Sequence, residues 1–225
     1  MEKYVTGNVA TNLYWLGRYL ERTATTLREI TIAYDNVIDI DKDAGVKLYD
    51  KYDIELEYTN AYDFLKQAIF GEHNANILNI LTYARENAII CRHLLDSESF
   101  GEIIELHGLF ADTHKNHLEI DYKLIDHAQS LISEIWYASS IREHQQLSDA
   151  FFKLGKIVEE ADYRIRFHEG EGEEIIASLY NKIDVLTEFL LSDHETTPEP
   201  STEILATQDE RLTELNEKID QIIIG

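Results

Sequence analysis

Proline is almost absent from this chain, and that absence constrains its fold more than any other feature. The sequence has 225 residues but only two prolines, Pro198 and Pro200, so the first 197 residues contain none. Because proline breaks helix interiors and marks turns, its absence favours long helices. Apolar residues also recur with the three-to-four spacing of a helix, at Leu13, Leu16, Leu20, Leu27 and Ile30.

The same spacing recurs further along the chain and predicts an all-α fold. A second run comprises Ile77, Leu81, Ala84, Ala88, Cys91 and Leu95. Residues 8–35 and 74–96 are expected to form long core helices, and further helical runs fall near 113–139, 146–168 and 173–192. We therefore expect a multi-helix up-and-down bundle of about six to eight helices over residues 1–193.

Glycines and one ambiguous segment divide the predicted helices. Breaks are expected at Gly45, Gly71, Gly101, Gly108, Gly170 and Gly172. In segment 38–60, Ile54, Leu56 and Tyr58 alternate as they would in a strand. A strand pair fits this pattern, but a loop and a short helix leading into 60–70 are preferred.

The charge balance excludes several classes of function. Lys and Arg number 20 against 43 Asp and Glu, so the formal net charge is −23. This balance argues against sequence-independent binding to nucleic acid, where cations neutralise phosphates, and against docking on anionic lipid. No apolar run is long enough to span a membrane, and the start of the chain shows no secretory signal. The lone cysteine, Cys91, rules out an internal disulfide, and a cytoplasmic protein is expected.

The end of the chain has a different composition from the rest. Residues 194–203 are polar and acidic and hold both prolines, which indicates a linker. Residues 204–225 follow with a short heptad-like pattern and predict an amphipathic helix. Such a short helix is marginal alone, so it either folds back on the bundle or joins two copies as a homo-oligomer.

Two segments of the chain resemble each other. Residues 14–28 (YWLGRYLERTATTLR) and 152–166 (FKLGKIVEEADYRIR) share the glycines Gly17 and Gly155 and the acids Glu21 and Glu159. A glycine inside a helix costs about 1 kcal/mol relative to alanine. Its recurrence at the same register suggests an internal repeat in which helix backbones touch at the glycines.

Charged residues interrupt the apolar helices at two places. Arg18, Glu21 and Arg22 lie among aromatic residues in the first helix, and Arg85, Glu86, Asn87 and Arg92 lie in the second run. If these residues are covered, they must be paired. They form either a structural ion network or a pocket for a carboxylate or phosphate. Glu21 is expected to be substantially buried, ionised and bonded to Arg18, Arg22, Arg85 or Arg92.

In combination, these motifs resemble the alpha-E family, a predicted helical family named for a Glu-Arg pair. The resemblance covers roughly residues 8–168. It rests on NLYWLGRYLER from Asn12 to Arg22, on ARENAIICR from Ala84 to Arg92, on Ser97, Glu98 and Phe100, and on FFKLGKIVEEAD. The second copy departs from the family pattern, because it carries Glu159-Glu160 where the family has Glu-Arg.

The resemblance implies a setting for the protein without implying a mechanism. Members of the family are associated in bacterial gene neighbourhoods with a circularly permuted ATP-grasp ligase and a transglutaminase-like peptidase. This implies a helper in peptide or amide-bond chemistry, and either protein is a candidate partner.

A metal site is the sharpest chemical alternative. His107, His114, His117 and Asp121 would share a stripe if residues 105–121 formed one helix, and imidazole with carboxylate suits zinc or iron. Their polar surroundings instead favour a solvated face, and the sequence predicts no metal site. No glycine-rich phosphate loop is present, so no cofactor is expected.

Two functions remain open from the sequence. The first is a non-catalytic accessory or scaffold protein that docks on a partner enzyme. The second is a small-molecule or peptide-binding protein, with or without catalysis, that uses the Arg/Glu cluster. A solvent-accessible cleft at the cluster would favour the second function, and a fully paired cluster would favour the first.

Overall fold

A computed structural model describes residues 5–140 and 147–167, together with residues 177 and 181. Within the described ranges the chain forms seven α-helices and no strand, which confirms the predicted all-α fold. The helices are α1 (Gly7–Asp39), α2 (Ala44–Asp50), α3 (Ala61–Phe70), α4 (Ile77–Ile90), α5 (Ser97–Lys115), α6 (Tyr122–Ser140) and α7 (Leu147–Phe167).

The described residues divide into two compact units. Residues 5–18 and 147–167 belong to one unit, and residues 19–140 belong to the other, so α1 contributes to both. The expected helix at 173–192, the linker at 194–203 and the terminal helix at 204–225 lie outside the described residues. The division into a bundle over 1–193, a linker and a terminal helix therefore stays a prediction.

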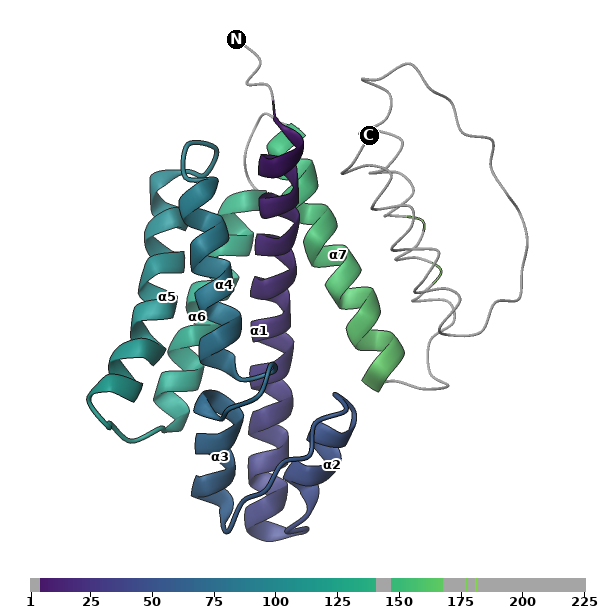
Figure 1. Cartoon of the computed structure of the whole chain (residues 1–225), viewed down its shortest axis with the longest axis vertical. Coiled ribbons are helices and arrows are strands. Elements are labelled where there is room, and N and C mark those ends of the chain that lie inside the picture. The colour runs from purple at the N-terminus through teal and green to yellow at the C-terminus, as the bar shows by residue number, and fades with distance from the viewer. Residues whose placement is uncertain (1–4, 141–146, 168–176, 178–180, 182–225) are drawn as a thin grey trace. The chain divides into compact units, whose positions relative to one another are not determined.

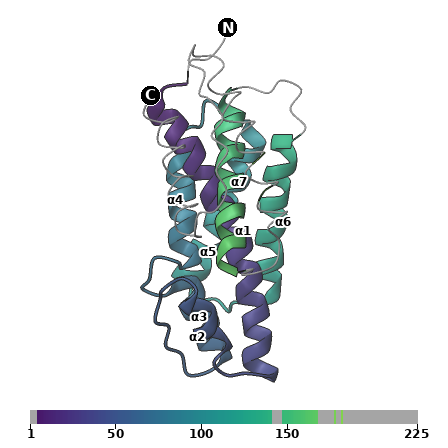
Figure 2. The same cartoon turned by 90° about the vertical axis from the view of Figure 1, so that its right-hand side faces the viewer.

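In the larger unit, α4, α5 and α6 run up, down and up again beside one another (Figure 1). Contacts join α5 to α6, α4 to α5 and α3 to α4. The core of this unit is built from fully buried residues such as Ile69, Ile77, Leu81 and Phe110. Figure 2 shows α2 and α3 together at one end of the same unit.

Side-chain caps fix where most of these helices begin. Asn60, Asn76 and Asp96 accept hydrogen bonds from the backbone N–H groups of Asp63, Asn79 and Ser99, at the starts of α3, α4 and α5. Asp121 does the same for the N–H of Leu124 at 2.9 Å, next to the start of α6. Such caps satisfy donors that the first turn of a helix leaves unpaired.

The structure confirms some predicted boundaries and corrects others. Segment 38–60 contains the short helix α2 and a non-regular stretch, as preferred from the sequence, with no strand. Gly71 ends α3 as expected, but Gly45 lies inside α2, and Gly101 and Gly108 lie inside α5. The predicted breaks at these three glycines are wrong, while Gly170 and Gly172 lie outside the described residues.

The single helical run predicted near 113–139 is also interrupted. The chain leaves α5 at Asn116, turns through His117 with φ of 51°, and begins α6 at Tyr122.

Helix α5 begins at Ser97 and continues through Gly101 and Gly108. The Asp96 cap and the apolar stripe of Ile103, Leu106 and Phe110 stabilise it by more than the two glycines cost.

Candidate functional site

The best-defined charged cluster joins the start of α1 to α7, within the smaller unit. Arg18 Nε lies 2.7 Å from Glu159 Oε2, and a terminal guanidinium nitrogen of Arg18 lies 3.5 Å from Asp162 Oδ2. The three side chains are 11, 5 and 10% exposed. Glu159 and Asp162 are three residues apart on α7, so one helix face presents both carboxylates to a single guanidinium fork.

The electrostatics of this cluster keep Arg18 charged. Burial by itself would lower the pKa of Arg18, but the neighbouring charges, that of Glu159 first, raise this pKa above its ordinary value. Burial has the opposite effect on the adjacent phenol and raises the pKa of Tyr14. Arg18 is therefore a permanent cation, compensated by two carboxylates in a poorly solvated setting.

Aromatic rings and a second arginine complete the cluster. The guanidinium carbon of Arg18 lies 5.2 Å from the centroid of the Trp15 ring and 6.0 Å from that of Tyr14. Arg166 Nε, one turn beyond Asp162 on α7, lies 3.1 Å from Asp162 Oδ1. The cluster thus balances two arginines against two carboxylates, with ring faces over one arginine.

Two glycines let the helices that carry this cluster approach each other closely. A Cβ at Gly17 would lie 2.1 Å from the carbonyl oxygen of Phe152, and a Cβ at Gly155 would lie 2.0 Å from that of Tyr14. The predicted backbone contacts at both glycines are confirmed.

The two contacts are also reciprocal. Tyr14 precedes Gly17 by the same three residues that separate Phe152 from Gly155. Equivalent positions of the two similar segments therefore contact each other in both directions, as they would about a local two-fold axis. The internal repeat stays an interpretation of this pattern.

Other residues of the predicted Glu-Arg cluster lie in the larger unit. Glu21 and Arg22 are half-buried in α1. Arg85 donates to the carboxylate of its neighbour Glu86 at 2.7 Å, with both side chains partly exposed. Arg92, just beyond α4, is exposed and places its guanidinium carbon 5.0 Å from the centroid of the Phe100 ring.

Asn87 is half-buried in α4, and its carbonyl accepts the N–H of Cys91 at the end of that helix. Within the larger unit, Arg85 and Arg92 therefore have different partners, an acid and an aromatic ring.

Sequence reasoning missed the two carboxylates that matter most to Arg18. The similarity of the two segments pairs Glu159 with Glu21, but it does not connect Glu159 or Asp162 with Arg18. The signal was present, because Glu159 and Asp162 share a helix face with apolar neighbours, which is unusual unless a cation is nearby. Gly155, which corresponds to Gly17, lies on the same helix as both carboxylates and lets that helix approach the backbone near Arg18.

The structure does not assemble the histidine alternative. His107 lies on α5 with its Nε2 3.4 Å from Thr82 Oγ1, while His114 in the last turn of α5 packs against Phe70 with the two rings tilted at 45°. His117 follows with a left-handed backbone conformation, and the Asp121 carboxylate accepts a hydrogen bond from the N–H of Leu124 near the start of α6. Among the described residues, no three His, Cys, Asp or Glu side chains are arranged to hold a metal ion.

With the geometry established, comparison with known proteins places the chain in a family. The sequence profile of the Alpha-E domain, described as a predicted alpha-helical domain with a conserved ER motif, matches residues 5–220. The chain belongs to the Alpha-E family. The match extends well beyond the motifs between residues 8 and 168 that suggested it. No curated protein and no solved structure matches the chain significantly.

Glu21 and Arg22 form a Glu-Arg pair in α1, and Arg18 precedes this pair by one turn. None of the described helices is both long and apolar enough to cross a membrane.

Proposed function

We propose that this Alpha-E chain is a non-catalytic helical accessory protein that docks on a partner enzyme. The observation that carries the proposal is the buried, compensated state of Arg18 between Glu159 and Asp162. An arginine already neutralised by two carboxylates has little charge left for a substrate anion. It is well suited to hold two helices in register, so the cluster supports a scaffold more than a reaction centre.

The partner we propose is an ATP-grasp-type peptide or amide ligase, with a transglutaminase-like peptidase as a further member of the system. Both come from the family resemblance, and the proposed setting is the bacterial cytoplasm, where ATP is available to such a ligase. The small-molecule or peptide-binding alternative would need the half-buried Glu21 and Arg22 to meet a ligand.

Co-purification tests the proposal directly. The full chain is co-expressed with the ATP-grasp protein encoded beside its gene, and the complex is measured by size-exclusion chromatography with light scattering. We expect a stoichiometric complex, and we expect the isolated chain to hydrolyse no ATP. A ligase that elutes alone at micromolar concentrations of both proteins would contradict the proposal.

A substitution in the Glu-Arg pair separates the two functions. Glu21→Gln keeps the shape of the side chain and removes its charge. For a scaffold, ligase binding should weaken only as far as the free energy of unfolding falls. For a ligand pocket, the variant would keep its stability and its ligase complex but lose a ligand or an activity.

A further inference from the structure

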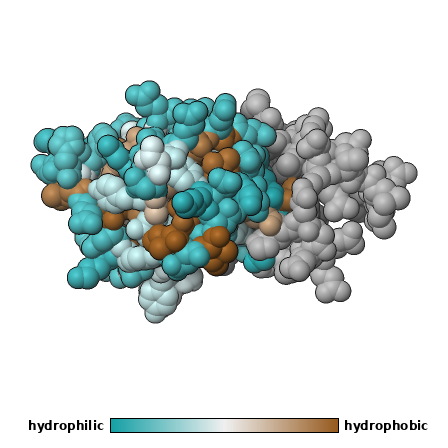
Figure 3. Space-filling view, turned by 90° about the horizontal axis from the view of Figure 1, so that it is seen from below, coloured by the Kyte–Doolittle hydropathy of each residue, from teal (hydrophilic) through white to brown (hydrophobic). Residues whose placement is uncertain are grey.

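The end of the molecule that carries α2 and α3 is largely hydrophilic on its described surface, and apolar side chains lie there in small groups (Figure 3). A pocket of about 870 Å³ lies at this end, beside the non-regular stretch 54–60 and between α1, α2 and the start of α3. We call it the loop pocket. Val37, Val46 and Leu56 belong to its apolar lining. Ligand pockets typically measure about 300–1,000 Å³, so the size of the loop pocket suits a small ligand.

Hydrogen bonds and close packing fix the walls of the loop pocket. The Tyr58 hydroxyl donates to the backbone carbonyl of Lys42 and accepts the N–H of Gly45 at 3.0 Å. A Cβ at Gly45 would lie 2.8 Å from the Tyr58 ring, so this ring packs directly on the backbone of α2. The Asp63 carboxylate accepts both the N–H and the hydroxyl of Thr59, at 2.8 and 3.0 Å. The pocket is therefore preformed, as binding sites for small molecules usually are.

Carboxylates outnumber cations around the loop pocket. Asp43, Glu57 and Asp63 line it together with one lysine, Lys42. Within the part of the chain that the structure describes, the exposed Glu57 carboxylate makes no hydrogen bond or ion pair. The surroundings have the same sign, because residues 35–63 include nine acidic residues and three lysines. The local field therefore attracts a positively charged group to this pocket.

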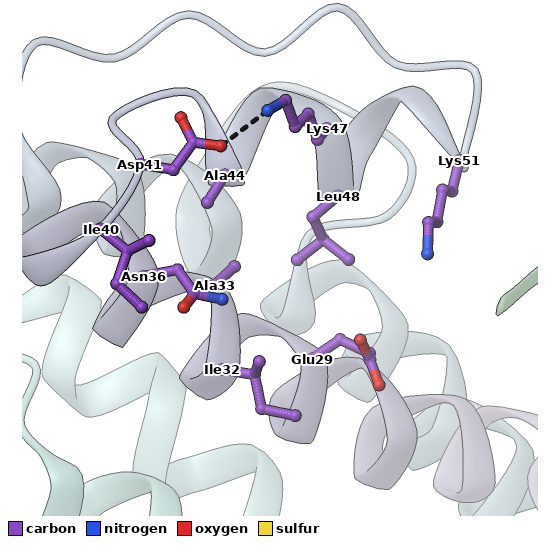
Figure 4. A pocket seen from close by; sticks show the side chains of 10 residues that line it. All are labelled: Glu29, Ile32, Ala33, Asn36, Ile40, Asp41, Ala44, Lys47, Leu48 and Lys51. Carbon is purple, nitrogen blue, oxygen red and sulfur yellow. Dashed lines mark hydrogen bonds and ion pairs between the residues drawn. The ribbon is translucent and has the colours of Figure 1, made fainter.

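The neighbouring hollow between α1 and α2 is balanced in charge (Figure 4). It measures about 330 Å³, and two acids, Glu29 and Asp41, line it with two lysines, Lys47 and Lys51. Lys47 Nζ also lies 2.7 Å from Asp41 Oδ2, so one acid and one lysine neutralise each other. This hollow presents no net charge to a ligand, whereas the loop pocket does.

The lining of the loop pocket indicates which chemistry fits it. Val37 and Leu56 are 8 and 5% exposed, so the apolar lining lies deep, whereas Asp43 and Glu57 are exposed. An aliphatic chain gains free energy when it leaves water for such a lining. A protonated nitrogen on that chain gains charge-assisted hydrogen bonds to the carboxylates. The small apolar groups outside the pocket offer less than the contiguous patch that is typical of a protein-docking surface.

We propose that the loop pocket binds an organic amine, an aliphatic chain that carries one or two protonated nitrogens. The methylene groups would pack on Val37, Val46 and Leu56, and an ammonium group would pair with Asp43 and Glu57. A free diamine and the side chain of a lysine share this chemistry. The inference goes beyond the proposed accessory function and does not depend on it.

Titration of the full chain with matched ligands tests the proposal. The chain is labelled with nitrogen-15 and titrated with 1,5-diaminopentane, and separately with glutarate, which has the same number of carbon atoms but two carboxylates. We expect the diamine to cause saturable chemical-shift changes centred on residues 42–63, and glutarate to cause none. Methylamine has the charge without the chain, so it should bind about tenfold more weakly or worse. Glutarate or methylamine binding as tightly as the diamine would overturn the proposal.

Two double variants separate the pocket from a diffuse attraction to an acidic surface. Asp43→Asn with Glu57→Gln should weaken diamine binding by about tenfold or more, because it removes two carboxylates of the pocket. Asp53→Asn with Glu55→Gln is the matched control, since both residues are exposed in the same region and neither lines the pocket. The control removes the same charge and should leave diamine binding within about twofold of the wild type. Equal losses in the two double variants would overturn the pocket.

A third ligand identifies the source of the amine. It is a short peptide, capped at both ends, with one lysine between glycines. Tighter binding of this peptide than of the diamine would assign the pocket to a lysine side chain, and the reverse order would assign it to a free amine. A ligase complex that forms while neither ligand binds would overturn the loop pocket and leave the accessory function standing.

Discussion

At the scale of single residues, Arg18 should be the most sensitive position in the smaller unit. Arg18→Met keeps much of the side-chain volume but removes the cation 2.7 Å from the buried Glu159 carboxylate, while Asp162 retains Arg166. The free energy of unfolding should fall by about 3–5 kcal/mol, as is typical when one partner of a buried pair is removed. Urea denaturation followed by circular dichroism measures this change.

The charge origin of this effect can be checked by removing the Glu159 carboxylate as well. In the Arg18→Met background, Glu159→Gln should recover part of the lost stability, because the amide is neutral and Asp162 keeps its pair with Arg166. Full additivity of the losses from Arg18→Met and Glu159→Gln would show that Arg18 contributes through packing alone.

His73 should give the larger unit a measurable dependence on pH. Its Nε2 lies 2.9 Å from the carbonyl oxygen of Gln67, and its ring packs on Tyr49 with 5.0 Å between centroids. Burial lowers the pKa of His73 below its ordinary value of 6.5. The unfolded chain therefore takes up this proton first as the pH falls. Stability present above pH 6.5 is lost as the pH falls through the lower folded pKa.

His73→Gln isolates this contribution, because glutamine can donate to the same carbonyl and does not titrate. The variant should lose less stability than the wild type when the pH is lowered from about 7.5 to about 5.5. His107, whose pKa burial also lowers, remains in both proteins and cancels in the comparison. Identical pH profiles of the two proteins would contradict the assignment.

At the scale of helices, alanine should lower the free energy of unfolding at Gly17, where two helices touch, and raise it at Gly101, where the helix is open. Gly17→Ala places a Cβ 2.1 Å from the Phe152 carbonyl oxygen, so the two helix backbones must separate. We expect a loss of about 1–3 kcal/mol in the free energy of unfolding from this overpacking. Gly101→Ala in α5 meets nothing within 4 Å and should gain up to about 1 kcal/mol from helix propensity.

A double variant then tests the reciprocal contact. Gly17→Ala and Gly155→Ala both push the same two backbones apart, so their losses should sum to less when combined. Differential scanning calorimetry of the single and double variants measures the coupling. Melting of Gly17→Ala at the wild-type temperature would remove the close-contact argument.

Helix boundaries show what the sequence could and could not predict. The lack of proline and the apolar period predicted α1 to within four residues, but the helix predicted over 74–96 ends at Ile90, because the chain turns at Cys91. The predicted breaks at Gly101 and Gly108 are wrong. A glycine marks a turn only where no helix cap and no continuous apolar stripe favour a helix around it. Asp96 caps α5 and its apolar stripe continues past both glycines, so the local cost was outweighed by packing.

The candidate site was predictable in its first helix and not in its partner. Arg18 was correctly identified as a cation that burial would force to pair. Which acid paired with it depended on where α7 crosses α1, and helical periodicity carries no such information. The sequence predicts that Glu21 bonds to one of four arginines, Arg18 among them, and this stays a prediction, whereas Glu159 and Asp162 from a distant segment contact Arg18.

At the scale of the whole molecule, excess negative charge should limit stability. Glu102 on α5 shows the effect locally, because burial first, and then Glu134 and other nearby carboxylates, raise its pKa. An acid with a raised folded pKa opposes folding once the pH rises enough to ionise it. With 43 acidic against 20 basic residues, such repulsion extends well beyond one helix pair.

Salt should therefore stabilise the protein at neutral pH. Raising sodium chloride from about 20 to about 200 mM shortens the screening length and weakens repulsion between exposed carboxylates, so the melting temperature should rise. Glu134→Gln should raise the melting temperature at low salt, because it removes the largest charge acting on Glu102, and this gain should shrink at high salt. Surface pairs such as Lys47–Asp41 weaken in salt, but each contributes little. A melting temperature that falls with salt would show that attractive pairs outweigh the repulsion expected from the charge count.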